Sequence, residues 1–163
     1  MLRTILISAA LVLTGASAHA QEMSEVETVA RAYMDAYSEL DWPAMERFLA
    51  EDVIFADETS TDPEHPGGID LVGRDALRQT LDDFIAQYNP ITLGFEWDTV
   101  FESNSRVVFI GHVNALYPTL DPAQRFRWRS QQVTVVTVEG GRVVEHRDYA
   151  NYPGAEQGLI PAE

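Results

Sequence analysis

The five residues V-I-F-A-D, residues 53–57, form a run of buried-strand type that ends in a carboxylate. Side chains alternate along a strand, so Asp57 would lie on the face of Val53 and Phe55, and the opposite face is also apolar. Desolvation raises the pKa of a carboxyl group and makes it a better base near neutral pH. The pattern indicates either an acid-base residue at the wall of a cavity or an aspartate that only ends the strand and caps the next turn.

A second group that could move protons lies near the end of the chain, in E-H-R-D-Y. His146 and Asp148 are two residues apart, so on a strand they share one face and form a titratable pair. If Gly140-Gly141 is a two-residue hairpin turn, His146 lies opposite Val135. The pattern leaves open whether this face lines the interior or the outside of the sheet.

The remaining candidates are more dispersed. Tyr33 lies on the apolar stripe of a predicted helix, where a buried phenol needs a hydrogen-bond partner. We take His112, Gln131, Trp97 and Phe55 as candidate ligand-contacting residues. The alternating arginines 125, 127 and 129 are more typical of a solvated strand than of an anion site. The sequence has no spaced set of metal ligands and no phosphate-binding or nucleophile motif, so we assign no metal and no cofactor.

Three helices are expected ahead of the strands that carry most of these residues. Ser24 and Glu27 form a capping box, and apolar residues then recur at helical spacing to Leu40. Asp41 can cap a short second helix from Trp42 to Leu49. Gly73 precedes a third helix of about 15 residues, which Pro90 ends.

The second half of the sequence is typical of strands. The predicted strands cover residues 91–102, 106–117, 125–138 and 142–150, which are rich in Val, Ile, Thr and aromatic residues. They follow one another closely, so they should pair antiparallel. Helices first and a sheet afterwards predict an α+β domain whose long sheet curls around the helices and leaves a hollow for a ligand.

Length, charge and the N-terminus limit the possible functions. The 163 residues fit one domain, and a net charge of −15 would repel nucleic acid. Arg3, the apolar run from Ile5 to Leu13 and Ala18-His19-Ala20 predict a cleaved signal peptide over 1–20 and one domain over 21–163. We therefore expect a periplasmic or secreted protein. No run of residues reaches the length of a membrane span.

Three motifs together resemble the nuclear transport factor 2-like superfamily, and in particular its SnoaL-like members. They are F-L-A-E-D-V-I-F-A-D, G-R-D-A-L-R and V-E-G-G-R-V-V-E-H-R-D-Y. The resemblance implies a cone-shaped, cystatin-like fold in which a curved antiparallel sheet wraps around three N-terminal helices. It also implies a pocket for a small apolar molecule and a homodimer formed through the outer sheet face.

Within that superfamily, ketosteroid isomerase is similar in two further residues. Tyr33 in R-A-Y-M-D-A-Y matches its tyrosine, which hydrogen-bonds the developing oxyanion, and Asp57 in F-A-D matches its proton-moving aspartate. Where that enzyme has a second acid, this chain offers Gln131, Gln132 or Thr134. SnoaL-like cyclases pair an aspartate with a histidine on late strands, which His146, Asp148 and His112 resemble.

The resemblance leaves three functions open. The first is a cofactor-independent isomerase, lyase or cyclase in which Asp57 moves a proton, Tyr33 stabilises the developing charge, and His146 or Asp148 is a second acid-base group. The second is an exported protein that binds a ligand without chemistry. The third is a dimeric association module whose hollow is filled by side chains.

Overall fold

The computed structural model describes residues 23–61 and 66–162, so the expected signal peptide, residues 1–20, lies outside the described part. Within the described part, no helix is both long and apolar enough to cross a membrane.

The three helices begin where their capping residues predict. Helix α1 spans Glu25–Ser38, and the Ser24 hydroxyl accepts a hydrogen bond from the Glu27 backbone N–H at 3.0 Å. Asp41 caps α2, Trp42–Glu46, by accepting from the Ala44 N–H at 3.1 Å. This helix is shorter than predicted because the chain already enters a strand at Leu49. Helix α3 spans Arg74–Tyr88 as predicted.

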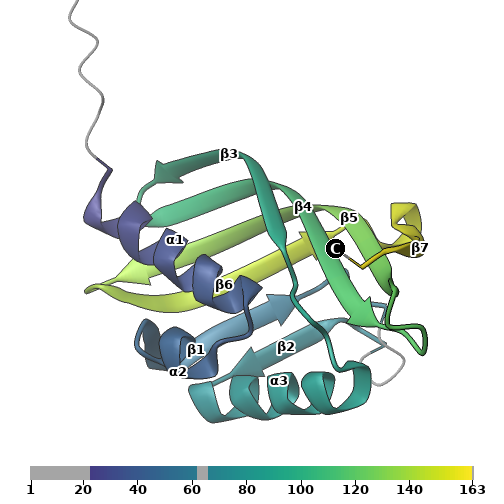
Figure 1. Ribbon diagram of the computed structural model, residues 1–163. Coiled ribbons are helices and arrows are strands. Elements are labelled where there is room, and N and C mark those ends of the chain that lie inside the picture. Colours follow the sequence, from purple (N-terminus) through teal and green to yellow (C-terminus); the bar gives the residue numbers. More distant parts are fainter. Residues whose placement is uncertain (1–22, 62–65, 163) are drawn as a thin grey trace, which may run out of the picture.

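Seven strands form one curved sheet with the order β2-β1-β6-β5-β4-β3, and β7 pairs with β5 at one end (Figure 1). Their bounds are β1 Leu49–Asp57, β2 Ile69–Val72, β3 Phe95–Ser103, β4 Arg106–Pro118, β5 Gln124–Glu139, β6 Arg142–Ala150 and β7 Glu156–Pro161. The four predicted late strands correspond to β3, β4, β5 and β6, and they pair antiparallel as expected.

Two features of the sheet differ from the sequence prediction. Strand β1 pairs in parallel with β6, so the sheet is mixed and not wholly antiparallel. Strands β2 and β7 were not predicted, because β2 has only four residues and β7 is mostly exposed and has little hydrophobic alternation. The predicted α+β class, with helices on a curved sheet, is confirmed.

Irregular pairing bends the sheet around α1. The strand register shifts between Trp97 and Thr99 of β3, and again between Thr137 and Val138 where β5 pairs with β6. Gly111 of β4 lies opposite the β3 irregularity, where a Cβ would collide with the Glu96 carbonyl oxygen. The close approach of the two strands therefore requires glycine.

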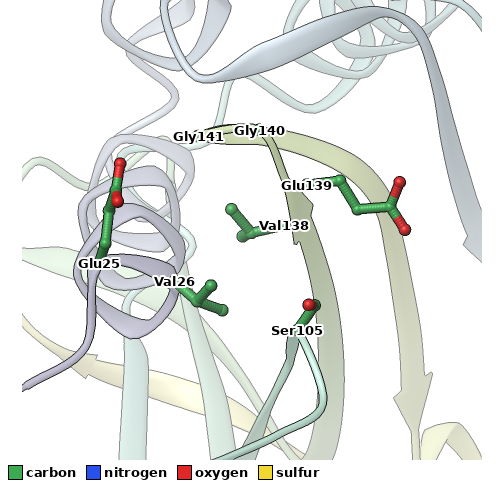
Figure 2. A pocket seen from close by; sticks show the side chains of 7 residues that line it. All are labelled: Glu25, Val26, Ser105, Val138, Glu139, Gly140 and Gly141. Atoms are coloured by element: carbon green, nitrogen blue, oxygen red, sulfur yellow. The ribbon is translucent and has the colours of Figure 1, made fainter.

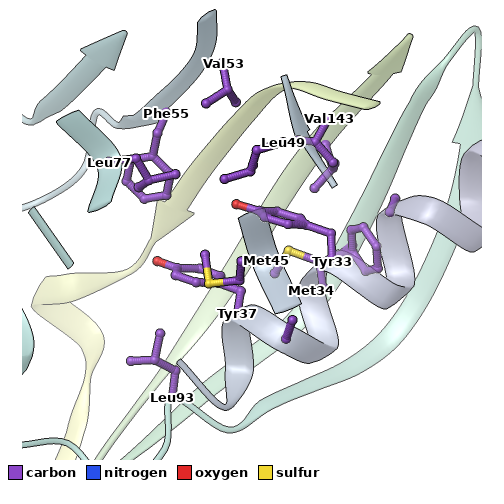
Figure 3. Packing of buried hydrophobic residues seen from close by; sticks show 14 of the residues in the cluster. Tyr33, Met34, Tyr37, Met45, Leu49, Val53, Phe55, Leu77, Leu93 and Val143 are labelled. Atoms are coloured by element: carbon purple, nitrogen blue, oxygen red, sulfur yellow. The ribbon is translucent and has the colours of Figure 1, made fainter. Parts of the chain in front are cut away.

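The concave side of the sheet holds the core. Tyr33, Met34 and Tyr37 of α1 point toward the sheet, as Figure 3 shows, and pack with Phe55 of β1 and Leu77 of α3. Strands β4, β5 and β6 contribute Val107, Phe109, Val136, Val138 and Val143, each at most 2% exposed. Residues at alternate positions of the same strands point to the convex side, which we call the outer face.

Candidate functional site

Asp57 ends β1 on the concave face, together with Val53 and Phe55, as alternation predicts. Its Oδ1 accepts hydrogen bonds from the Thr59 backbone N–H at 3.2 Å and the Thr59 hydroxyl at 2.9 Å. Its Oδ2 accepts from the Tyr152 hydroxyl at 2.5 Å. Burial raises the pKa of Asp57, and these hydrogen bonds oppose the rise in part. Asp57 therefore caps the turn and also lies inside the fold.

Tyr33 and His146 form a buried pair between α1 and β6. Both side chains are 0% exposed, and the Tyr33 oxygen lies 2.8 Å from His146 Nδ1. The His146 ring also contacts the rings of Tyr37, at 5.1 Å between centroids, and Phe55, at 4.8 Å. Burial, and secondarily the charge of Asp148, raise the pKa of Tyr33 well above its usual range. The phenol is therefore neutral and available as a donor.

Asp148 extends this pair along β6. Its Oδ1 lies 2.9 Å from His146 Nε2, although the contact lacks the alignment of a hydrogen bond. The same oxygen accepts from the Thr134 hydroxyl at 2.5 Å, and Thr134 accepts from Gln132 Nε2 at 3.0 Å. Because a carboxylate only accepts, the close contact favours a proton on Nε2, which leaves Nδ1 of a neutral ring to accept from Tyr33.

The two carboxyl groups lie on neighbouring strands. Asp57 and Asp148 are partners in the parallel register of β1 and β6, and the charge of Asp148 contributes to the raised pKa of Asp57. We call the group on this part of the concave face the inner polar cluster: Tyr33, Asp57, Gln132, Thr134, His146 and Asp148. All six residues are buried. The contacts from Tyr33 through His146 and Asp148 to Thr134 can hold and relay a proton, and Asp57 lies beside this chain on the neighbouring strand.

His146 faces the interior because of an irregularity that the sequence did not reveal. The two-residue turn predicts Val135 opposite His146, but the observed partner is Val136. The register shifts by one residue between Thr137 and Val138, so β6 gains one residue relative to β5. A shift of one residue turns every following side chain to the other face. The prediction of Val135 as the partner was therefore wrong.

His112 and Gln131 lie apart from this cluster, on the outer face of β4 and β5. They are partners in the strand register, and His112 Nδ1 lies 3.7 Å from an Asp98 oxygen. Both line an outer hollow of about 400 Å³ together with Ile110 and Tyr149. They therefore do not share the concave face with Asp57, because alternation places their neighbours Val113 and Gln132 inside.

Phe55 and Trp97 both pack on the concave side. Phe55 is 5% exposed and contacts His146 directly. Trp97 stacks on Phe95 at 5.1 Å and contacts Phe109 at 5.2 Å between ring centroids. Trp97 therefore belongs to the aromatic packing of β3 and β4, and Phe55 lies beside the inner polar cluster.

Asp57 and Tyr33 do not face an open hollow in this structure, because Tyr33 is 0% and Asp57 7% exposed. A cavity of about 430 Å³ lies elsewhere, at the start of α1, lined by Glu25, Val26 and the turns that contain Ser105 and Gly140 (Figure 2). Gln132 of the inner polar cluster lies among the residues that line the outer hollow, whereas Asp57, Tyr33, His146 and Asp148 line neither hollow. Because the residues of the cluster are at most 7% exposed, a ligand that contacts them must displace a side chain.

The sequence reasoning missed Tyr152, which contacts Asp57, and a separate group of aromatic residues that contact one another. Tyr152 follows β6, lies half-buried, and contacts Trp128 of β5 at 5.4 Å between ring centroids. A second group joins α3 to the sheet through successive ring contacts of Phe84, Tyr88, Tyr117 and Phe126. Phe126 and Trp128 share a strand face, which alternation along residues 125–130 could have indicated. In the described residues, no three acidic or histidine side chains are placed to hold a metal ion.

The comparisons with known proteins concern both family and fold. The profile of the SnoaL-like domain family matches residues 30–146. No curated protein has a matching sequence. A solved structure described as a putative SnoaL-like polyketide cyclase from Shewanella denitrificans OS-217 is similar, with a TM-score of 0.67 and 19% identity, over 80% of this chain and 93% of the other.

Two further solved structures of this fold are described together with a small molecule. One is a hypothetical protein of ketosteroid isomerase-like fold from Catenulispora acidiphila DSM 44928 in complex with trimethylamine, with a TM-score of 0.57 and 14% identity, over 74% of this chain and 83% of the other. The other is a computationally designed 17-OHP binder, with a TM-score of 0.63 and 16% identity, over 83% and 100%. At these identities the likeness concerns the fold.

Proposed function

The chain belongs to the SnoaL-like family, and on that premise we propose that it binds a small, largely apolar molecule on the concave side of its sheet and moves a proton without a cofactor. One observation carries the proposal. Two carboxyl groups, an imidazole and a phenol from three separate elements meet in one buried group, the inner polar cluster. Burial of several titratable groups together is costly and is common at catalytic sites.

Asp57 is the group we assign as the proton carrier. Its raised pKa makes it a stronger base than a solvated aspartate once it is ionised. Thr59 holds Oδ1 through two hydrogen bonds that belong to the local turn, so the carboxyl group is oriented before a ligand arrives. Oδ2 is then the oxygen that faces the ligand.

His146 and Asp148, on the neighbouring strand β6, are assigned as the second acid-base group. Thr134 and Gln132 fix Asp148 through the hydrogen bonds described above. Tyr33 already donates to His146, so we assign it to orient and polarise the imidazole and not to contact the ligand directly. This differs from the role that the resemblance to ketosteroid isomerase implies for Tyr33.

The proposal also includes export of the protein and formation of a homodimer. The N-terminal 20 residues support export to the periplasm or the medium. The exposed outer-face residues Ile110 and Tyr149 support a homodimer through that face, because exposed apolar side chains on a sheet favour association. A binding protein without chemistry is the alternative, and turnover separates the two.

A general test of the catalytic base is the ring opening of 5-nitrobenzisoxazole. A base removes the ring C–H proton, the N–O bond breaks, and the electron pair remains on a coloured phenolate. We expect wild-type protein to accelerate this reaction and Asp57→Asn to lower the accelerated rate by about a hundredfold, the usual contribution of a positioned base.

The matched control is Asp98→Asn, the same chemical change at an exposed position on β3. Its rate should equal that of the wild type, and circular dichroism should show all three proteins folded. Equal rates for Asp57→Asn and wild type, or a wild-type rate at buffer background, would remove the catalytic proposal and leave the binding alternative.

A further inference from the structure

Tyr152 occupies an unusual place at the junction of two strands. Strands β6 and β7 both pair with β5, and a short 3₁₀ turn, Tyr152–Gly154, interrupts them. Asn151 supports the turn, because its Oδ1 accepts from the Gly154 N–H at 3.2 Å. The interruption directs the Tyr152 side chain toward the concave face, where it meets Asp57.

The contacts of Tyr152 are those that a ligand of Asp57 would make. Its hydroxyl donates to Asp57 Oδ2 at 2.5 Å and also bonds the Ser60 side chain. Its ring lies on Trp128 at 5.4 Å with an angle of 43° between the planes. A neutral donor therefore points at the carboxylate, and a flat ring lies against an indole.

The two oxygens of Asp57 are held by different segments of the chain, which shows which hydrogen bond a ligand could replace. Oδ1 is held by Thr59, two residues along the chain, and Thr59 in turn accepts from the Ala150 N–H at 2.8 Å. These bonds belong to the turn and to its join with β6. The bond from Tyr152 to Oδ2 comes from a separate segment, so it can be lost without disturbing the turn.

We propose that Tyr152 is an intramolecular competitor that covers Asp57 until a ligand with a flat ring displaces it and presents a hydroxyl, an enol or an acidic C–H to the carboxylate. The ligand would then donate to Asp57 Oδ2 and lie on Trp128 in place of the tyrosine ring. This inference rests on the proposed function, because it takes Asp57 as the group that meets the ligand. It also accounts for the low exposure of a cluster that otherwise has the chemistry of a site.

The displacement needs little rearrangement. Tyr152 is half-buried, but its neighbours Asn151, Pro153 and Gly154 are exposed, and β7 beyond them is largely exposed. Rotation of one side chain about its Cα–Cβ bond would free Oδ2. A competitor of this kind lowers the apparent affinity by the fraction of molecules in the open state, so its removal should tighten binding.

The test is calorimetric titration of the full chain with 2-naphthol, a flat ring with one hydroxyl. We expect Tyr152→Ala, which removes both ring and donor, to bind on the order of tenfold more tightly than wild type. Tyr152→Phe, which keeps the ring, should lie between them. Tyr88→Ala, the same change at an exposed tyrosine at the end of α3, is the matched control and should bind like wild type.

Weaker or unchanged binding by both Tyr152 variants would overturn the inference, because Tyr152 would then be a wall of the site or unrelated to it. Since Tyr152→Phe changes one oxygen atom, it keeps the test valid if the alanine variant loosens the turn. The two proposals fail separately. Turnover that depends on Asp57, with no effect of Tyr152 on binding, removes only the competitor, whereas tighter binding by the variants without such turnover removes only the catalytic function.

Discussion

The concave face of the sheet has two halves that are equally buried and chemically opposite. On β5, Val136 and Val138 are followed toward the other end of the strand by Thr134 and Gln132, and all four are at most 5% exposed. On β6, Val143 lies at one end and Asp148 at the other. We call the first the apolar half, formed by Val107, Phe109, Val136, Val138 and Val143, and compare it with the inner polar cluster.

The difference shows which part of the interior stabilises the fold. Burial of the apolar half removes hydrocarbon from water at no polar cost. Burial of the inner polar cluster is tolerated only because its groups have hydrogen-bond partners, and replacing such groups by apolar residues is often neutral. Packing alone therefore explains the apolar half but not the polar one, and this asymmetry supports a functional role for the cluster.

The largest expected effect tests the apolar half. Phe109 is fully buried beside Trp97, so Phe109→Ala should remove about 3–5 kcal/mol from the free energy of unfolding, through lost transfer energy and the cavity left behind. Urea denaturation followed by tryptophan fluorescence measures it. Thr134→Val in the polar cluster is the comparison and should cost about 1–3 kcal/mol, because it leaves Asp148 and Gln132 each without one hydrogen-bond partner. If both variants lost the same free energy of unfolding, the two halves would contribute equally to the stability of the fold.

The sequence predicted the apolar half better than the polar one, for a physical reason. Apolar residues at regular spacing indicate a helix or strand without knowledge of the rest of the chain, which is why α1 and α3 and four strands agree with prediction. The face of Asp57 also followed from alternation within one strand. These inferences need only local information.

The polar cluster depends on features that are not local. One extra residue in β6 turns His146 inward, and nothing in R-V-V-E-H distinguishes the residue that is out of register. Tyr152 reaches Asp57 only because a turn interrupts two strands that share one partner. Thr134 and Gln132 were considered only as replacements for a missing acid, and their bonds to Asp148 need the β5–β6 register.

An intermediate effect is expected at the contact between helix and cluster. Tyr33→Phe keeps the ring in place but leaves His146 Nδ1 buried without its donor, which should cost about 1–3 kcal/mol of unfolding free energy. The same urea titration measures the loss. Tyr37→Phe on the next turn of α1 is the control, because Tyr37 contacts His146 through its ring. An unchanged free energy of unfolding in Tyr33→Phe would show that the hydrogen bond does not stabilise the cluster.

The smallest expected effect is a dependence of stability on pH that comes from Asp57. Burial raises its pKa in the folded protein above the ordinary value of 3.8, so the folded state holds this proton more tightly than the unfolded chain. The contribution of Asp57 to stability is then neutral below pH 3.8, falls as the pH rises through the folded pKa, and stays unfavourable above it. Asp57→Asn removes this term, so its unfolding free energy relative to wild type should increase across that window and then level off. Urea titrations of both proteins from pH 4 to pH 8 measure the difference, with Asp98→Asn in parallel as the exposed counterpart. A difference that decreases with pH would mean that the hydrogen bonds from Tyr152 and Thr59 outweigh burial, and that Asp57 is held as a structural carboxylate and not as a base.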